Sequence, residues 1–226
     1  MRWLTNNWPQ VVELILAHLA LSVPAIVLSV LIAVPLGRFA YRHPRLGGPV
    51  LSAASLLYAV PALPLLIIIP VLFGVPLRSA ATMIIALTIY GVALLVRTAA
   101  DAFASVDPLA RQAAIAVGHS PRSVFWRVDL PLAVPVLISG IRVVTVSTIG
   151  LVTIGALIGV SSLGTLLTDG FQRGLISEVT VGIVATVVLA LLLDGLALVA
   201  GRMLTPWERT TAAAGTPSSN SPAGVA

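Results

Sequence analysis

The sequence predicts an all-α protein: a polytopic transmembrane helical bundle of about five to six spans. Hydrophobic residues make up 58% of the 226 positions and charged residues only 9%, far below the roughly one-quarter charged content of a soluble domain. The apolar residues also fall into long runs, and a helix needs about 20 of them to cross roughly 30 Å of hydrocarbon. Five such runs lie at residues 11–36, 47–73, 77–96, 132–160 and 179–201.

The second run is long enough to be divided into two pieces by its prolines. Pro61, Pro64 and Pro70 each lack a backbone N–H and clash with the preceding helical turn. The carbonyl groups freed by such a break are tolerated at membrane depth only where protein or a water-filled cavity satisfies them. We therefore expect the stretch from Tyr58 to Pro64 to face the interior of the bundle. A simple proline kink between two lipid-facing helices is the alternative.

The arginines predict the orientation, because the chain has no lysine and every basic side chain is an arginine. Most arginines follow the first run, lie between the third and fourth runs, or follow the fifth; only Arg2, Arg78 and Arg173 fall on the other side. The positive-inside rule then predicts an external N-terminus and a cytoplasmic C-terminus. We divide the chain into a short external N-terminus (1–10), a transmembrane domain (11–206) and a disordered cytoplasmic tail (207–226), whose residues are small, polar and proline-bearing.

Several classes of function are disfavoured by what the sequence contains. The net charge of +5 reflects membrane topology, and no basic patch interleaved with aromatic residues indicates nucleic-acid binding. The chain has no cysteine and no phosphate-binding glycine loop, so we expect no catalytic, cofactor-binding or metal-ligating residues. His18 and His43 have no partner at catalytic spacing, and we expect them to be solvated or interfacial. The sequence is typical of a membrane transport protein rather than of an enzyme.

A polar stretch between the third and fourth runs, residues 101–131, is divided by helix start and stop signals. Asp107 is a candidate N-cap followed by Pro108, and Gly118 stands where a left-handed C-cap is expected. Ser120 and Pro121 repeat the start signal. Asp129, Leu130 and Pro131 form a third candidate start, for the long apolar helix that follows.

The first short helix has the character of a docking element. Leu109, Ala113, Ala116 and Val117 share one face at helical spacing, and the small alanines would let a partner approach the backbone closely. We expect Phe125, Trp126 and Val128 to anchor the second short helix under the spans.

The spacing of this stretch resembles the cytoplasmic signature of the permeases of ABC importers. That signature is Glu-Ala-Ala, three residues, Gly, nine residues, Ile, one residue and Leu-Pro. The matching positions here are Gln112, Ala113, Ala114, Gly118, Val128, Leu130 and Pro131. Gln112 replaces the usual glutamate and loses its charge, whereas Val128 keeps the apolar β-branched character of isoleucine.

The resemblance implies a type I ABC importer permease fold in the cytoplasmic membrane of a prokaryote, with a cytoplasmic coupling helix between spans three and four. It also implies three protein partners: a separate ATPase subunit that binds ATP, an extracytoplasmic substrate-binding protein, and a second permease subunit, identical or homologous. The alternative from another class is a self-contained secondary transporter or channel. Such a protein would be expected to show internal repeats or several intramembrane acidic groups.

Within the importers, the chain is similar to the osmoprotectant branch, which carries glycine betaine, choline, carnitine or proline betaine. Residues 18–37, 58–66, 140–150 and 156–167 look like recurring blocks of that branch. A permease for another small solute, such as an amino acid, is the alternative. Aromatic faces hold quaternary ammonium groups, so Tyr58 and Tyr90, together with Pro61 and Pro64 at the helix break, are the candidate residues of the translocation path.

Two ionisable residues fall inside the runs. Arg142 lies 11 residues beyond Pro131, and Asp194 lies 8 residues before Arg202, which places them about 16 and 12 Å from the cytoplasmic ends of their helices at 1.5 Å per residue. Because an unpaired charge is costly at these depths, we hypothesise an ion pair between them. Separate contact with a wet cavity is the alternative.

Overall fold

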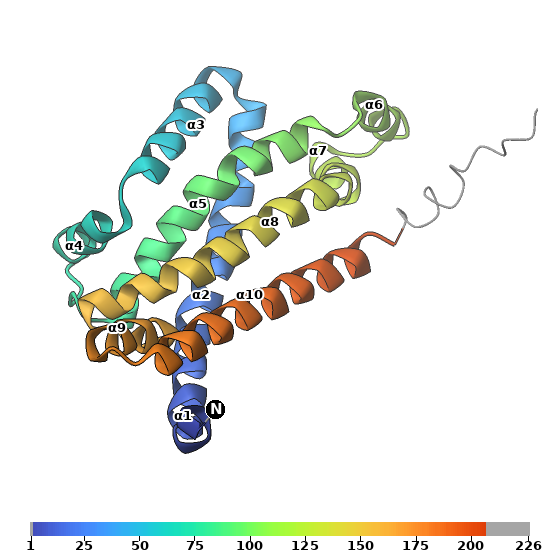
Figure 1. The fold of residues 1–226 in the computed structure, drawn as a ribbon. Coiled ribbons are helices and arrows are strands. Elements are labelled where there is room, and N and C mark those ends of the chain that lie inside the picture. The colour runs from blue at the N-terminus through green and yellow to red at the C-terminus, as the bar shows by residue number, and fades with distance from the viewer. Residues whose placement is uncertain (1, 207–226) are drawn as a thin grey trace, which may run out of the picture.

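The computed structural model describes residues 2–206, and all regular structure in that part of the chain is helical (Figure 1). The elements in chain order are α1 (Arg2–Asn6), α2 (Trp8–Arg42), α3 (Pro44–Ala59), α4 (Ala62–Phe73), α5 (Ala80–Ala104), α6 (Pro108–Ala116), α7 (Pro121–Val124), the π-helix η1 (Phe125–Asp129), α8 (Leu130–Val152), the 3₁₀-helix η2 (Thr153–Ile158), α9 (Leu163–Arg173) and α10 (Ile176–Leu204). The predicted all-α class is confirmed. The predicted tail, residues 207–226, lies outside the described residues.

Within the described residues, four helical stretches are long and apolar enough to cross a membrane, and a bent pair adds a fifth candidate. The four are α2, α5, the stretch from Pro121 to Ile158, and α10. The pair α3 and α4 is bent by 111° where the second apolar run was expected to divide. α5 continues to Ala104, beyond the predicted end at residue 96.

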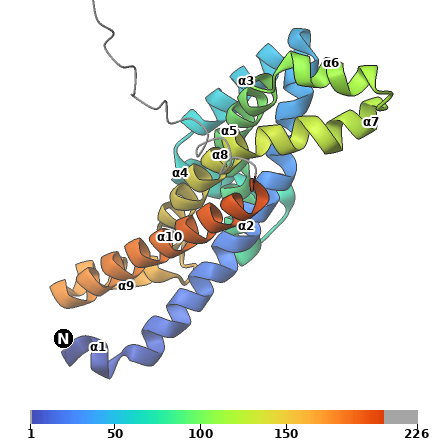
Figure 2. The same cartoon turned by 90° about the vertical axis from the view of Figure 1, so that its right-hand side faces the viewer.

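α2 and α5 pack against each other, and their ribbons lie close together in both Figure 1 and Figure 2. Small residues permit this close approach. A side chain at Gly37 of α2 would place its Cβ 2.5 Å from the Cβ of Ala99 on α5. Near this contact, in the C-terminal part of α5, the side chains of Ala99, Ala100 and Ala102 are buried. Close packing of small residues is how membrane helices associate without a hydrophobic driving force between them.

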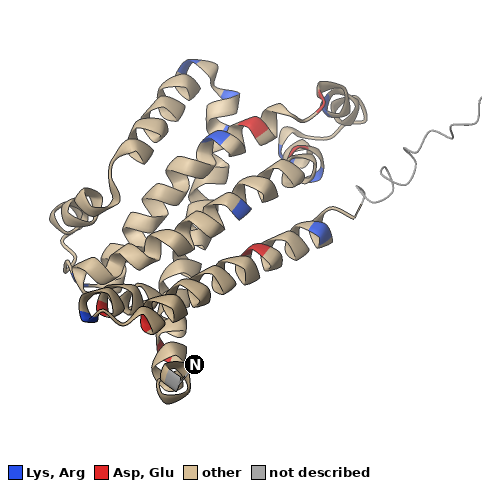
Figure 3. Cartoon of the chain, viewed as in Figure 1, with Lys and Arg blue, Asp and Glu red and all other residues tan. Residues whose placement is uncertain are grey.

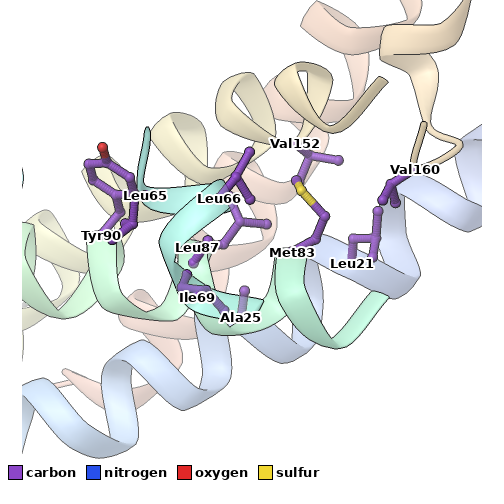
Figure 4. Packing of buried hydrophobic residues seen from close by; sticks show 11 residues of the cluster. Leu21, Ala25, Leu65, Leu66, Ile69, Met83, Leu87, Tyr90, Val152 and Val160 are labelled. Carbon is purple, nitrogen blue, oxygen red and sulfur yellow. The ribbon is translucent and has the colours of Figure 1, made fainter. Parts of the chain in front are cut away.

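The largest core cluster joins segments that are far apart in the sequence (Figure 4). It is formed by Leu21 and Ala25 of α2, Leu65, Leu66 and Ile69 of α4, Met83, Ala86, Leu87 and Tyr90 of α5, Val152 of α8, and Val160. Because α4 contributes to this cluster, the second half of the bent pair is packed against the bundle rather than standing free.

The break between α3 and α4 is closed by a side chain of α5. Pro64 has no N–H to give to the carbonyl of Val60 four residues earlier, and the hydroxyl of Tyr90 donates a hydrogen bond to that carbonyl instead. The rings of Tyr58 and Tyr90 meet edge to face, with centroids 6.0 Å apart. In the single chain, Tyr90 is buried, whereas Tyr58, Pro61 and Pro64 are exposed. The backbone carbonyl freed at the break is therefore satisfied by a side chain of α5. The side of the break that carries Tyr58, Pro61 and Pro64 is exposed.

A second change of helix geometry lies where α8 passes into η2. The N–H of Thr153 bonds to the carbonyl of Gly150, so the α-helical bond from residue 153 to Ile149 is not made. Nε2 of His18 lies 3.1 Å from the Ile149 oxygen; because the carbonyl can only accept, Nε2 carries the proton of this bond. The expectation that His18 is solvated or interfacial is wrong: its side chain is buried within the bundle.

The helix α9 was not anticipated from the apolar runs. Ser162 and Thr165 form a capping box at its start, and Gly174 ends it with a φ of 68°. These local signals were present in the sequence. Leu163 and Leu166 bury one face of α9 in the core, while Phe171 is exposed.

We expect Tyr90→Phe to lower the free energy of unfolding by about 1 kcal/mol, because the Val60 carbonyl would lose its donor at membrane depth. The measurement is unfolding of the purified chain in a detergent titration. Tyr58→Phe is the matched control, since its hydroxyl makes no hydrogen bond to the described residues. Equal stability of the two variants would contradict the role assigned to Tyr90.

Candidate coupling site

The elbow between α5 and α8, residues 105–129, is built by the capping signals that the sequence displays. The carboxylate of Asp107 accepts a hydrogen bond of 2.8 Å from the N–H of Leu109, which starts α6. Gly118 has a φ of 89°, and the N–H of His119 reaches back to the carbonyl of Ala114 at 3.1 Å. Ser120 then caps α7 by accepting from the N–H of Ser123. The first two predicted starts and the predicted C-cap are confirmed.

One face of α6 is left without a partner in the single chain. Gln112, Ala113 and Ala116 are exposed, and Leu109 and Val117 are 70% and 76% exposed. These are the residues of the predicted docking face, together with Gln112. An apolar surface with small residues at its centre is typical of a protein–protein contact.

The predicted third helix start at Asp129 is wrong. α7, η1 and α8 run on without an interruption, and Asp129 has helical φ and ψ angles with no capping bond. Its side chain is buried and accepts a hydrogen bond of 2.7 Å from Nε of Arg111 on α6. The carboxylate therefore holds the coupling segment against α8 rather than starting a helix.

Arg111 is the centre of this contact. Besides Asp129, its guanidinium donates to the hydroxyl of Tyr41 on α2 at 2.9 Å and approaches the carbonyl of Phe103 on α5 at 3.5 Å. Burial alone would lower the pKa of Arg111, but the hydrogen bonds to Asp129 and Tyr41 outweigh it and raise that pKa. α6 is thus bound through one side chain to α2, α5 and the helix that leads into α8.

A second arginine, Arg38 of α2, lies on the other side of Asp129. Its Nη2 is 3.9 Å from the carboxylate, and its guanidinium carbon is 3.3 Å from the centre of the Phe125 ring. Phe125 therefore anchors the elbow as expected, through a cation–π contact as well as packing. Trp126 does not, because its side chain is 59% exposed.

The seven positions of the signature separate into two groups in space. Gln112 and Ala113 are exposed on α6, whereas Ala114 is buried and Gly118 makes the turn. Val128, Leu130 and Pro131 are half-buried at the start of the long helix. Gln112 and Ala113 belong to the exposed face of α6, and the other positions build the turn and the start of the long helix. The sequence pattern did not reveal Arg111, Tyr41, Arg38 and Asp129, which fix the elbow in place.

The structure brings Arg142 of α8 and Asp194 of α10 together. Nε and Nη2 of the arginine donate to the two carboxylate oxygens at 2.8 and 2.6 Å. This bidentate geometry is the strongest form of an ion pair. The contact joins α8 to α10, which is otherwise largely exposed in the single chain.

Charged side chains are unevenly distributed between the two ends of the bundle (Figure 3). Blue segments gather at the end that carries α6 and α7, including the last turns of α2 and α10. Arg78 and Arg173 belong to the other end, with Glu13, Asp169 and Glu178. The elbow is therefore on the more basic side.

The fold defines the class of this protein. A chain of the inward-facing MetNI methionine ABC transporter superposes with a TM-score of 0.75 at 20% sequence identity, over 86% of this chain and 96% of that chain. The architecture is that of a type I ABC importer permease. A family profile described as "Binding-protein-dependent transport system inner membrane component" matches residues 25–209, so the chain belongs to that family. It is a multi-pass permease subunit, and the ATPase of such a transporter is a separate subunit.

Curated relatives cover nearly the whole chain. The osmoprotectant import permease protein OsmW of Salmonella typhimurium is 33% identical over 205 residues, which is 87% of this chain and 92% of the relative. The choline transport system permease protein OpuBB of Bacillus subtilis is 30% identical, over 91% of this chain and 94% of the relative.

We expect Arg142→Asp and Asp194→Arg each to reduce the amount of folded protein in the membrane, because each leaves two like charges facing one another. The double variant with exchanged charges should recover most of that loss. Fluorescence-detected size-exclusion chromatography of the solubilised chain measures the folded fraction. A double variant no better than either single one would contradict a direct pairing.

Proposed function

We propose that this chain forms the translocation path of an importer for a compatible solute such as glycine betaine, choline, carnitine or proline, and that α6 couples it to a separate ATPase subunit. The observation that carries the proposal is the elbow: an exposed face of α6 held to three spans by the buried contact of Arg111 with Asp129. A helix that is free on one side and fixed on the other is suited to passing a partner's movement to the spans.

The proposed substrate class is inferred from the names of the relatives. OsmW and OpuBB are named for osmoprotectant import and choline transport, and their likeness extends over most of this chain. A quaternary ammonium cation interacts favourably with aromatic faces. Tyr58, Pro61 and Pro64 on the exposed side of the helix break, with the buried Tyr90 behind them, remain the candidate path residues. Tyr58 is the exposed aromatic residue among them.

The assembly and orientation are part of the same proposal. The basic end with the elbow faces the cytoplasm, where the ATPase subunit binds ATP, and the chain itself uses no cofactor. A substrate-binding protein delivers the solute at the opposite end. The largely exposed surfaces of α4 and α10 support association with a second permease subunit, identical or homologous, in the lipid bilayer.

The coupling role predicts that Gly118→Val reduces ATP-dependent uptake of labelled glycine betaine at least about tenfold. A β-branched residue is strongly disfavoured at the φ of 89° that ends α6, so the docking face would be displaced. The measurement uses proteoliposomes that contain the permease with its ATPase and binding protein, and records both uptake and ATP hydrolysis.

Gly48→Val is the matched control, because Gly48 lies on α3 with open space around it and no positive φ. Uptake and ATP hydrolysis should become uncoupled in the Gly118 variant alone. Unchanged uptake in that variant would remove α6 from the coupling path. Uptake of another solute in place of betaines by the unaltered transporter would contradict the substrate class and leave the coupling role intact.

A further inference from the structure

A long apolar groove lies between α2, α8 and α10 at the elbow end of the bundle. Its volume is about 610 Å³, and its wall is apolar except at one end, where Arg38 stands beside Phe125 and Trp126. Along α8 the groove runs from Leu130 to Ile141. The 11 helical steps between these two residues span about 16 Å, which is about half the roughly 30 Å thickness of the hydrocarbon core. The groove therefore has the length of one acyl chain in one leaflet.

The mouth of the groove carries a positive charge that the chain does not neutralise. Arg38 and Arg111 share the single carboxylate of Asp129, and that carboxylate takes its hydrogen bond from Arg111. The Arg38 side chain is only 17% exposed, yet its guanidinium donates no hydrogen bond to the described residues. Arg42, one turn further along α2, is exposed and adds positive charge on the same side.

Trp126 gives the mouth the character of a membrane interface. The indole is 59% exposed and lines the groove next to Arg38. Tryptophan is enriched where the hydrocarbon meets the headgroup layer. Along the groove, apolar side chains are followed by an indole and then by a guanidinium. A phospholipid has the matching order of acyl chain, interfacial region and phosphate.

We propose that this groove is a binding site for one anionic phospholipid of the leaflet on the elbow's side, with an acyl chain between α2 and α8 and the phosphate on Arg38. An arginine fork is suited to a phosphate group, and basic residues next to a membrane attract anionic headgroups. The bound lipid supplies the negative charge that Asp129 cannot provide to both arginines. The site does not depend on the transported solute or on coupling.

The test measures lipid binding to the purified full chain by native mass spectrometry. Dioleoylphosphatidylglycerol is compared with dioleoylphosphatidylcholine, which has the same chains and no net charge. Arg38→Gln should reduce the preference for phosphatidylglycerol about fivefold, the effect of one arginine near an anionic surface. Arg45→Gln, an exposed arginine of the same basic end, should leave the preference unchanged.

A second variant tests the groove without altering the charge. Leu31 lines the groove and is 63% exposed, so Leu31→Trp should fill the space, fold normally and lower the binding of both lipids. Leu28→Trp is its control, on an exposed position of α2 that does not line the groove. The comparison of Leu31→Trp with Leu28→Trp tests the lipid site even if Arg38→Gln fails to fold.

Three results would overturn the proposal. The first is an unchanged phosphatidylglycerol preference in a folded Arg38→Gln variant, or unchanged lipid binding in Leu31→Trp. The second is displacement of the lipid by millimolar inorganic phosphate, which would indicate a site for a free anion. The third is cross-linking of two copies through Leu31→Cys, a unique cysteine in this cysteine-free chain, because the groove would then be covered by a second permease subunit.

Discussion

The buried contact between Arg111 and Asp129 is the interaction on which the elbow depends. α6 is a helix of 9 residues, and isolated helices of this length are marginal in water. Its position is fixed because Arg111 also reaches Tyr41 of α2 and the Phe103 carbonyl of α5. Since Asp129 belongs to the uninterrupted helix that becomes α8, a displacement of α6 must either move that helix or break the contact.

Inside the bundle, backbone irregularities are tolerated because neighbouring helices satisfy them. Pro64 leaves the Val60 carbonyl without its helical donor, and Tyr90 supplies one. The change to 3₁₀ geometry at the end of α8 leaves the Ile149 carbonyl without its α-helical donor, and His18 donates a hydrogen bond to it. Both donors come from other spans, which is the condition that a bilayer sets for non-helical backbone. The bent and tightened segments are thereby held in defined positions.

The sequence predicted those features that are decided by nearby residues. Apolar runs predicted the spans, and Gly118 predicted the end of α6, because both signals are local. Depth along straight helices was enough to suggest that Arg142 and Asp194 could meet. The roles of Asp129 and His18 were missed because each contacts a helix whose placement depends on the intervening turns. An acidic residue before Leu-Pro is also a normal helix start, and nothing local separates that role from a buried ion pair.

Hydrogen–deuterium exchange of the α6 amides in a double-mutant cycle tests the anchoring of α6 most directly. Arg111→Gln and Asp129→Asn should each accelerate exchange across residues 108–116 at least about tenfold, because a charge-assisted hydrogen bond contributes about 1.5 to 3 kcal/mol. The double variant should exchange little faster than either single one, since both remove the same contact. Unchanged protection of α6 in the single variants, or additive effects in the double variant, would contradict the account.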